Sequence, residues 1–177
     1  MVKTDCSANT WVSNYLCENM EWVINCTADC EEDFDIDDLN LSAATKNGWK
    51  HYPVEVKTIK GGYKYQNNTW FLDGIRKKSK FEEKVEDDVK MYILNQKKYN
   101  KLIEAHAILI YLFPDGMLLF SPKSLKKAFV CFGEFLNKSH TEEFGEPFNP
   151  HYETKAYLNL DEGWFVPCDP PIELFQK

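Results

Sequence analysis

The amino-acid sequence predicts a single α/β domain, residues 1–177, in which helices flank a mixed β-sheet. Residues 52–59 alternate apolar and polar side chains, as a half-buried strand does. Residues 105–113 form a nearly continuous apolar run, which is typical of a buried strand. Apolar residues recur at helical spacing over 11–26 and 80–103. With 44% hydrophobic residues, a chain of this length can bury a substantial core.

The first half of the chain is expected to begin with the helix over about 11–26, capped by Asn9 or Thr10. The segments expected after it are a short strand over 38–42, a polar loop over 43–51, the strand over 52–59 and a further strand over 69–75. Gly61 and Gly62 end the strand over 52–59. Neighbouring strands joined by loops favour an antiparallel meander in this region.

The second half is expected to begin with the helix over about 80–103. Ser79 and Glu82 form a capping box at its start. The segments expected after it are the strand over 105–113, a turn over 114–116, a strand over 117–120, a helix starting at Ser121-Pro122 and a strand over 154–160. This order of elements predicts an α/β domain with a mixed sheet.

The net charge of −7 is unevenly distributed along the chain. Residues 1–55 hold 3 basic and 11 acidic side chains, whereas residues 56–130 hold 15 basic and 8 acidic ones. An acidic chain is a poor general DNA binder, because phosphate contacts come from clustered lysine and arginine. The basic middle of the chain predicts either a locally positive surface or ordinary solvated charge.

Several features favour an intracellular, cytoplasmic protein. No apolar run reaches the roughly 18 residues that a membrane span needs, and the N-terminal residues carry no apolar signal segment. Six cysteines without an export signal are expected to be reduced thiols. A metal cluster would need four closely spaced ligands, and only Cys26 and Cys30 stand close together in sequence. No membrane association is therefore expected.

A glutamate and a lysine on the strand over 52–59 are the strongest candidates for catalytic residues. The chain has four acid-x-Lys triplets, starting at Glu55, Glu82, Asp88 and Glu153. Residues i and i+2 share a face on a strand but not on a helix, which favours the first and last triplets. Only the triplet at Glu55 follows an aspartate-bearing strand. Carboxylates from two strands can hold Mg²⁺ together with waters and substrate phosphate.

The aspartate expected beside this triplet is Asp38. Val54 and Val56 are expected to face the core, so that Glu55 and Lys57 face the opposite way. The same alternation leaves Asp38 opposite the core, and pairing of the two strands would bring it beside Glu55 and Lys57. Asp35 and Asp37 are the alternatives if the strand begins earlier or carries a bulge.

A helix, an aspartate-bearing strand and a strand with hydrophobic-Glu-x-Lys together resemble the PD-(D/E)xK nuclease superfamily, which has a restriction-endonuclease-like fold. The resemblance covers roughly residues 11–113 and departs from the family pattern in having Asp37, not proline, before Asp38. It implies a nuclease acting on DNA or RNA, in which Asp38 and Glu55 hold Mg²⁺ or Mn²⁺ and Lys57 activates water. Some relatives add a glutamate from the first helix and a glutamine from the second, which indicates Glu18 and Gln96 as auxiliary residues.

The competing hypothesis is a non-catalytic acidic interaction protein on the same fold, which binds a basic or nucleic-acid-handling protein. Under either hypothesis, a homodimer or a protein partner could supply binding surface. The aspartates at 33, 35 and 37 do not form a calcium loop, since the sixth and twelfth positions are Asp38 and Ala44. The four histidines show no zinc spacing, and the chain has no glycine-rich phosphate loop.

Overall fold

The computed structural model of this chain describes residues 7–28, 38–59, 63–66, 69–72, 91–137 and 151–176. Its helices are α1 (Ser7–Asn19), α2 (Gln96–Glu104), α3 (Pro122–Ala128) and the short 3₁₀ segments η2 (Leu160–Glu162) and η3 (Ile172–Phe175). Its strands are β1 (Val23–Ala28), β2 (Leu39–Thr45), β3 (Gly48–Thr58), β4 (Tyr63–Gln66), β5 (Thr69–Leu72), β6 (Met91–Asn95), β7 (Ile108–Phe113), β8 (Gly116–Phe120), β9 (Phe129–Asn137), β10 (His151–Asn159) and β11 (Trp164–Pro167). None of the helices in these ranges is long and apolar enough to cross a membrane.

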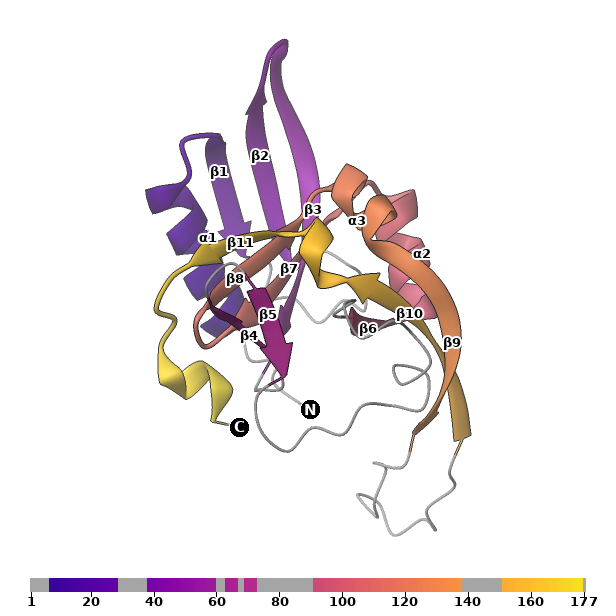
Figure 1. Cartoon of the computed structure of the whole chain (residues 1–177). Coiled ribbons are helices and arrows are strands. Elements are labelled where there is room, and N and C mark those ends of the chain that lie inside the picture. Colours follow the sequence, from indigo (N-terminus) through magenta and orange to yellow (C-terminus); the bar gives the residue numbers. More distant parts are fainter. Residues whose placement is uncertain are drawn as a thin grey trace, which may run out of the picture.

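Six strands form a central mixed sheet in the order β1-β2-β3-β7-β8-β11. Strands β3 and β7 are parallel, and the other neighbouring pairs are antiparallel. Helix α1 lies on one side of this sheet, and α2 and α3 lie on the other (Figure 1). The predicted class, α/β with a mixed sheet flanked by helices, is confirmed.

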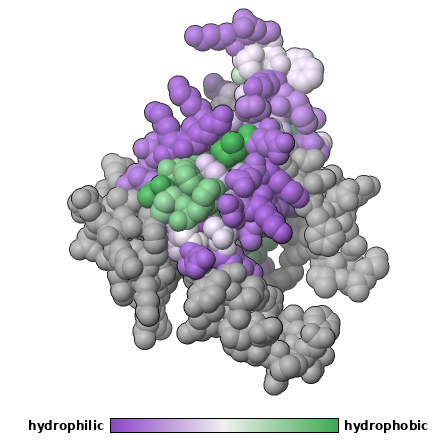
Figure 2. All heavy atoms as spheres, turned by 90° about the vertical axis from the view of Figure 1, so that its right-hand side faces the viewer, coloured by the Kyte–Doolittle hydropathy of each residue, from purple (hydrophilic) through white to green (hydrophobic). Residues whose placement is uncertain are grey.

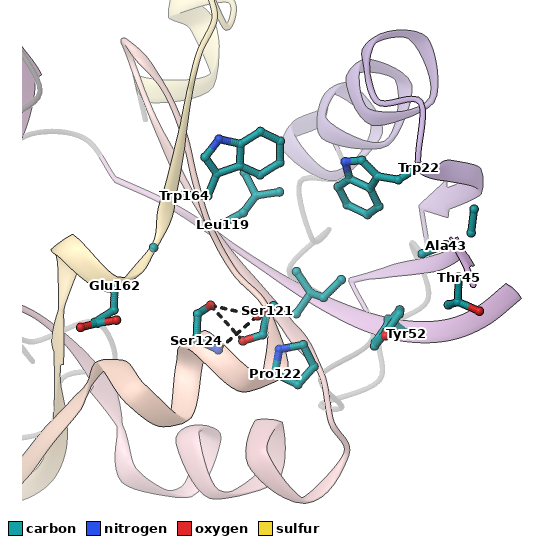
Figure 3. A pocket seen from close by; sticks show the side chains of 13 residues that line it. Trp22, Ala43, Thr45, Tyr52, Leu119, Ser121, Pro122, Ser124, Glu162 and Trp164 are labelled. Carbon is teal, nitrogen blue, oxygen red and sulfur yellow. Dashed lines mark hydrogen bonds between the residues drawn. The ribbon is translucent and has the colours of Figure 1, made fainter. Parts of the chain in front are cut away.

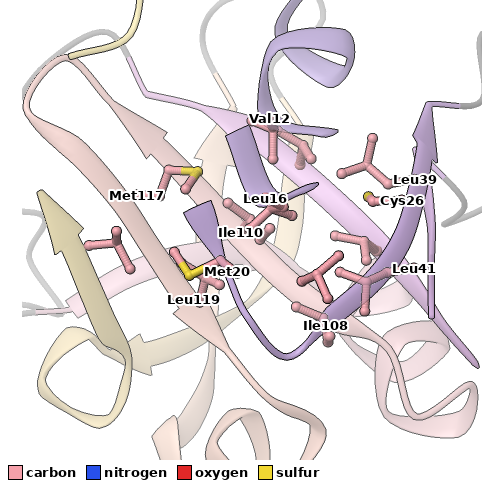
Figure 4. Packing of buried hydrophobic residues seen from close by; sticks show 14 of the residues in the cluster. Val12, Leu16, Met20, Cys26, Leu39, Leu41, Ile108, Ile110, Met117 and Leu119 are labelled. Atoms are coloured by element: carbon pink, nitrogen blue, oxygen red, sulfur yellow. The ribbon is translucent and has the colours of Figure 1, made fainter. Parts of the chain in front are cut away.

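The core on the α1 side holds that helix against the sheet. Val12 and Leu16 of α1 are fully buried, and they pack with Leu39 of β2, Val54 of β3 and Ile110 of β7 (Figure 4). Val12 and Leu16 are four residues apart and therefore project from one face of the helix. Burial of each such aliphatic side chain contributes about 1.5–3 kcal/mol to stability.

The core on the other side is built around α2 and α3. Leu102 of α2 and Leu125 of α3 are fully buried together with Leu109 of β7. A second sheet, in the order β6-β10-β9, adds Ala156 and Leu158 of β10 to the same cluster. The apolar residues of β7 therefore serve two cores, which explains why this strand is buried along its whole length.

The predicted helix over 11–26 is wrong in its second half. Helix α1 ends at Asn19, and Val23–Ala28 form strand β1, which pairs antiparallel with β2. Val23, Ile24 and Thr27 are β-branched residues that favour strands, and pairing with β2 satisfies their backbone hydrogen-bonding groups. The helix also starts earlier than predicted, at Ser7, so Asn9 and Thr10 lie inside it.

Two further predictions require correction. Residues 91–95, expected within the helix over 80–103, form strand β6; α2 then begins at Gln96, where the Asn95 side chain accepts a hydrogen bond from the Lys97 backbone N–H at 2.9 Å. Residues 80–90 and the capping box lie outside the described residues.

The predicted polar loop over 43–51 is a tight β2–β3 hairpin, because Gly48 adopts a φ of +122° after a two-residue turn.

Five of the other predicted elements are found in the structure. The run over 105–113 contains β7, the predicted turn follows it, and β8 pairs antiparallel with β7. The predicted start of the third helix is correct, because Ser121 caps α3 and Pro122 is its first residue. The strand predicted over 154–160 corresponds to β10, and the one over 69–75 contains β5.

Two glycines with positive φ differ in their surroundings, which predicts different costs for alanine. A Cβ at Gly48 would meet nothing within 4 Å, whereas a Cβ at Gly116 (φ +156°) would contact the Val166 carbonyl oxygen and lie 2.7 Å from the Phe165 ring. We expect Gly48→Ala to lower the free energy of unfolding by about 1–2 kcal/mol through backbone strain alone. Gly116→Ala should cost about 2–5 kcal/mol, since overpacking adds to the strain. Urea denaturation of both variants checks this, and equal losses would contradict it.

Candidate functional site

Glu55 is a buried carboxylate in the middle of the central sheet. Its neighbours Val54 and Val56 point into the α1-side core, so strand alternation directs Glu55 towards α2. Only 3% of Glu55 is exposed. A glutamate is almost never this deeply buried unless it is paired, so its partners define the site.

Two lysines form ion pairs with the same oxygen of Glu55. Lys57 Nζ lies 3.2 Å from Glu55 Oε1, and Lys98 Nζ of α2 lies 3.0 Å from the same atom. The other oxygen, Glu55 Oε2, is buried and has no hydrogen-bond partner within the described part of the chain. Buried polar atoms without partners are rare, and they often mark the place of a water, an ion or a reacting group.

Asp38 lies beside this glutamate at the start of β2. Leu39 pairs with Val54 across the β2–β3 ladder, so the register places Asp38 next to Glu55. Asp38 Oδ2 accepts a hydrogen bond from the Val56 backbone N–H at 2.8 Å. Its Oδ1 accepts a hydrogen bond from the Asn9 side-chain amide of α1 at 3.3 Å. Two strands and one helix therefore position the Asp38 carboxylate.

Opposing electrostatic effects act on the Glu55 carboxylate. Burial raises the pKa of Glu55, the Asp38 carboxylate raises it further, and Lys57 and Lys98 act against both effects. Two carboxylates held close together, one with an unpaired buried oxygen, are a suitable ligand pair for Mg²⁺, which usually keeps several waters. Within the described ranges, no group of three or more histidine, cysteine, aspartate or glutamate side chains could hold a metal ion.

The structure brings together three of the five predicted site residues. Asp38, Glu55 and Lys57 meet at adjacent positions of β2 and β3. Glu18 is exposed near the end of α1, nine residues after Asn9, which corresponds to roughly 13 Å along the helix axis. Gln96 is half-buried at the first position of α2, and it is not among the side chains that pair with Glu55. The alternatives Asp35 and Asp37 lie outside the described residues.

Sequence reasoning missed Lys98 and Asn9 as members of this cluster. Lys98 belongs to the basic middle of the chain, which the sequence predicts as surface charge, and the resemblance indicates Gln96 as the auxiliary residue of the second helix. Because α2 begins at Gln96, Lys98 lies beside the buried Tyr99 and its side chain reaches Glu55. The sequence predicts Asn9 as a helix cap, whereas its side chain is buried against Asp38.

A separate cavity of about 610 Å³ lies on the α1 side of the sheet. Trp22, Tyr52 and Trp164 border it, and Ser121 and Ser124 hydrogen-bond to each other at its edge (Figure 3). It contains none of the residues of the Glu55 cluster, so it is distinct from the candidate site. No sequence pattern predicted it, because its residues come from segments far apart in the chain.

The chain was compared with models of protein families, with curated proteins and with solved structures, and none of them matches it. The chemistry of the candidate site is therefore inferred from its own residues and geometry.

Proposed function

We propose that this protein is a metal-dependent nuclease of the PD-(D/E)xK type that hydrolyses phosphodiester bonds in DNA or RNA. One observation carries the proposal. The buried Glu55 carboxylate lies beside Asp38, one of its oxygens has no hydrogen-bond partner among the described residues, and Lys57 ion-pairs with the other oxygen. Carboxylates on adjacent strands, together with a lysine two residues after one of them, are the groups that the resemblance implies for this chemistry.

The order of elements supports the same proposal. Helix α1, strands β1 to β6, helix α2 and strand β7 follow one another along the chain, and they span the segment over which the resemblance extends. Strand β3, which carries Glu55 and Lys57, lies in the sheet between β2 and β7. A restriction-endonuclease-like core is the arrangement we propose for these elements.

The roles proposed for the side chains follow from their positions. Asp38 and Glu55 would hold Mg²⁺ or Mn²⁺, and the bound ion would polarise the phosphate and lower the pKa of a bound water. Lys57 is the more exposed of the two lysines at Glu55, with 41% of its side chain exposed against 24% for Lys98. Its ammonium is therefore available to orient the attacking water or to contact the scissile phosphate. Lys98 approaches from α2 and holds the Glu55 carboxylate in place.

The charge distribution limits how this nuclease would bind its substrate. With a net charge of −7, the chain has little general attraction for the phosphates of duplex DNA. Substrate binding must therefore come from local positive regions, or from a homodimer or protein partner. The acidic first third of the chain suits a partner with a basic surface.

Metal-dependent cleavage tests this function directly. We expect the wild type to cleave labelled single-stranded DNA, RNA or duplex DNA with Mg²⁺ or Mn²⁺ and not with EDTA. Asp38→Asn should lower the rate by about 100-fold or more, because it removes a ligand charge. Asparagine keeps an oxygen that can accept the Val56 N–H, so the strand end is preserved. Absence of cleavage with either metal would contradict the nuclease and favour the non-catalytic interaction protein.

A further inference from the structure

The β2–β3 hairpin extends beyond the rest of the central sheet. The last pair of the β1–β2 ladder at this end joins Val23 to Ala43, and the β3–β7 ladder begins only at Val54. Ala44 N–H still donates to the Trp22 carbonyl oxygen at 2.8 Å. Beyond it, Thr45 of β2 and residues 48–53 of β3 pair only within the β2–β3 ladder among the described residues. Figure 1 shows the resulting two-stranded arm projecting past β1, and in Figure 2 its tip stands above the neighbouring surface.

The side chains at this end of the arm have a distinctive composition. Trp49 is 67% exposed, which is more than the other large hydrophobic residues of the described part of the chain. Lys46, Lys50 and His51 surround it in sequence, and all three are exposed. Residues 39–54 contain no aspartate or glutamate, although residues 1–55 hold 11 acidic side chains. The segment that presents the Trp49 indole therefore carries no acidic side chain, although it lies within an acidic part of the chain.

The arm leads to the candidate site along one face of β3. Trp49 and His51 have the same parity as Glu55 and Lys57, so all four share a face of the strand. Six residues of strand separate Trp49 from Glu55, which corresponds to roughly 20 Å. Lys50 points to the other face, where its ammonium lies 5.1 Å from the centre of the Tyr52 ring. The arm thus offers an aromatic surface on one side and a cation on the other.

We propose that this arm binds single-stranded nucleic acid that passes around the narrow hairpin, with the Trp49 indole stacked on an unpaired base on one face and with Lys46 at the turn and Lys50 on the other face contacting phosphates. Aromatic stacking combined with positive charge is the usual way in which proteins bind single strands. A duplex fits less well, because its bases are already stacked on each other. This inference rests on the proposed nuclease function. It adds that the substrate is single-stranded and that it would run along β3 to Lys57.

Binding without catalysis tests the arm separately from the nuclease function. Fluorescence anisotropy of a labelled single-stranded DNA of about 12 nucleotides, in EDTA and about 50 mM salt, measures Kd with no cleavage. We expect Trp49→Ala to weaken binding about tenfold and Trp49→Phe to retain most of it. Lys46→Ala with Lys50→Ala should reduce the slope of log Kd against log salt by about 1.4, since two phosphate contacts are lost.

Matched controls come from elsewhere in the chain. Trp164→Ala removes another exposed indole, and Lys126→Ala with Lys127→Ala removes two exposed lysines of α3; neither should change Kd more than about twofold. Equal losses in the Trp49→Ala and Trp164→Ala variants, no binding by the wild type, or tighter binding of a matched duplex would overturn the proposal. Binding that depends on Trp49 in a protein without nuclease activity would support the arm and contradict only the proposed function.

Discussion

Replacing Lys57 with alanine is expected to lower the rate of metal-dependent phosphodiester cleavage by about 10²–10⁴-fold, the range over which a positioned proton-transfer or charge-stabilising group acts. Lys57 Nζ is 3.2 Å from Glu55 Oε1, and 41% of the side chain is exposed. Its removal should change the midpoint of thermal unfolding little, because Lys98 still pairs with Glu55. Single-turnover cleavage rates, measured with Mg²⁺ and with Mn²⁺, check the prediction.

The chain offers a matched control for this variant. Glu153 and Lys155 form the same acid-x-Lys triplet on strand β10, with an ion pair of 2.8 Å. Lys155→Ala removes a strand lysine of equal spacing and similar pairing, so it should leave the cleavage rate within about twofold of the wild type. A Lys57→Ala variant that cleaves as fast as wild type, or a Lys155→Ala variant that is equally impaired, would contradict a catalytic role for Lys57.

Removing both lysines from the buried carboxylate is expected to have the largest effect on stability. We expect Lys57→Met with Lys98→Met to lower the free energy of unfolding by about 2–4 kcal/mol at pH 7. Breaking a buried ion pair costs about 3–5 kcal/mol, and the partial exposure of both lysines reduces that cost. The double variant leaves Glu55 buried and charged beside Asp38 without a compensating cation. Urea denaturation at pH 7 measures the loss.

The pH dependence of this loss identifies its cause. Burial and Asp38 raise the pKa of Glu55 in the folded protein, so its folded state binds a proton more readily than the unfolded state does. Stability from this group is therefore complete below the unfolded pKa near 4.5 and declines as pH rises through the folded pKa. Without the lysines the folded pKa rises further, so the double variant should approach wild-type stability at acidic pH.

Glu55→Gln provides the control for this explanation. Glutamine carries no charge at any pH, so adding Glu55→Gln to the double variant should restore most of the lost stability at pH 7. If the two lysine substitutions destabilise the protein equally in the Glu55→Gln background, their effect comes from lost packing and not from the buried carboxylate. Comparing the lysine substitutions in the wild-type and the Glu55→Gln backgrounds therefore separates charge from packing at the site.

The Asp38 carboxylate has a structural role as well as the proposed ligand role. Its two oxygens join the Val56 backbone of β3 and the Asn9 side chain of α1 to the start of β2. An aspartate needed only for this junction would tolerate asparagine, since the amide oxygen still accepts the N–H of Val56 and the Asn9 amide can flip to accept from the new NH₂ group. Retained stability with lost cleavage in Asp38→Asn would therefore separate the catalytic role from the structural one.

The apolar pattern of the sequence by itself determined the strands at the centre of the fold. The alternation in β3 and the continuous apolar run in β7 predicted both elements, because alternation and full burial are local properties that a strand expresses along its own length. The same alternation predicted that Glu55 and Lys57 face away from Val54 and Val56. Pairing of Leu39 with Val54 then followed the expected core faces and placed Asp38 beside Glu55.

Only the tertiary structure decided which more distant side chains join this site. Lys98 reaches Glu55 because α2 packs against the sheet and begins at Gln96. Strand β6 precedes it, and the apolar residues of β6 also fit the spacing of a helix, so the sequence predicted a helix there. Asn9 reaches Asp38 because α1 starts at Ser7, so that Asn9 lies in its first turn and donates a hydrogen bond to Asp38. Helical and strand preferences compete within short apolar segments, and the competition is decided by contacts with partners distant in sequence. For β1 and β6 those partners are β2 and β10, which supply the backbone hydrogen bonds that local sequence cannot specify.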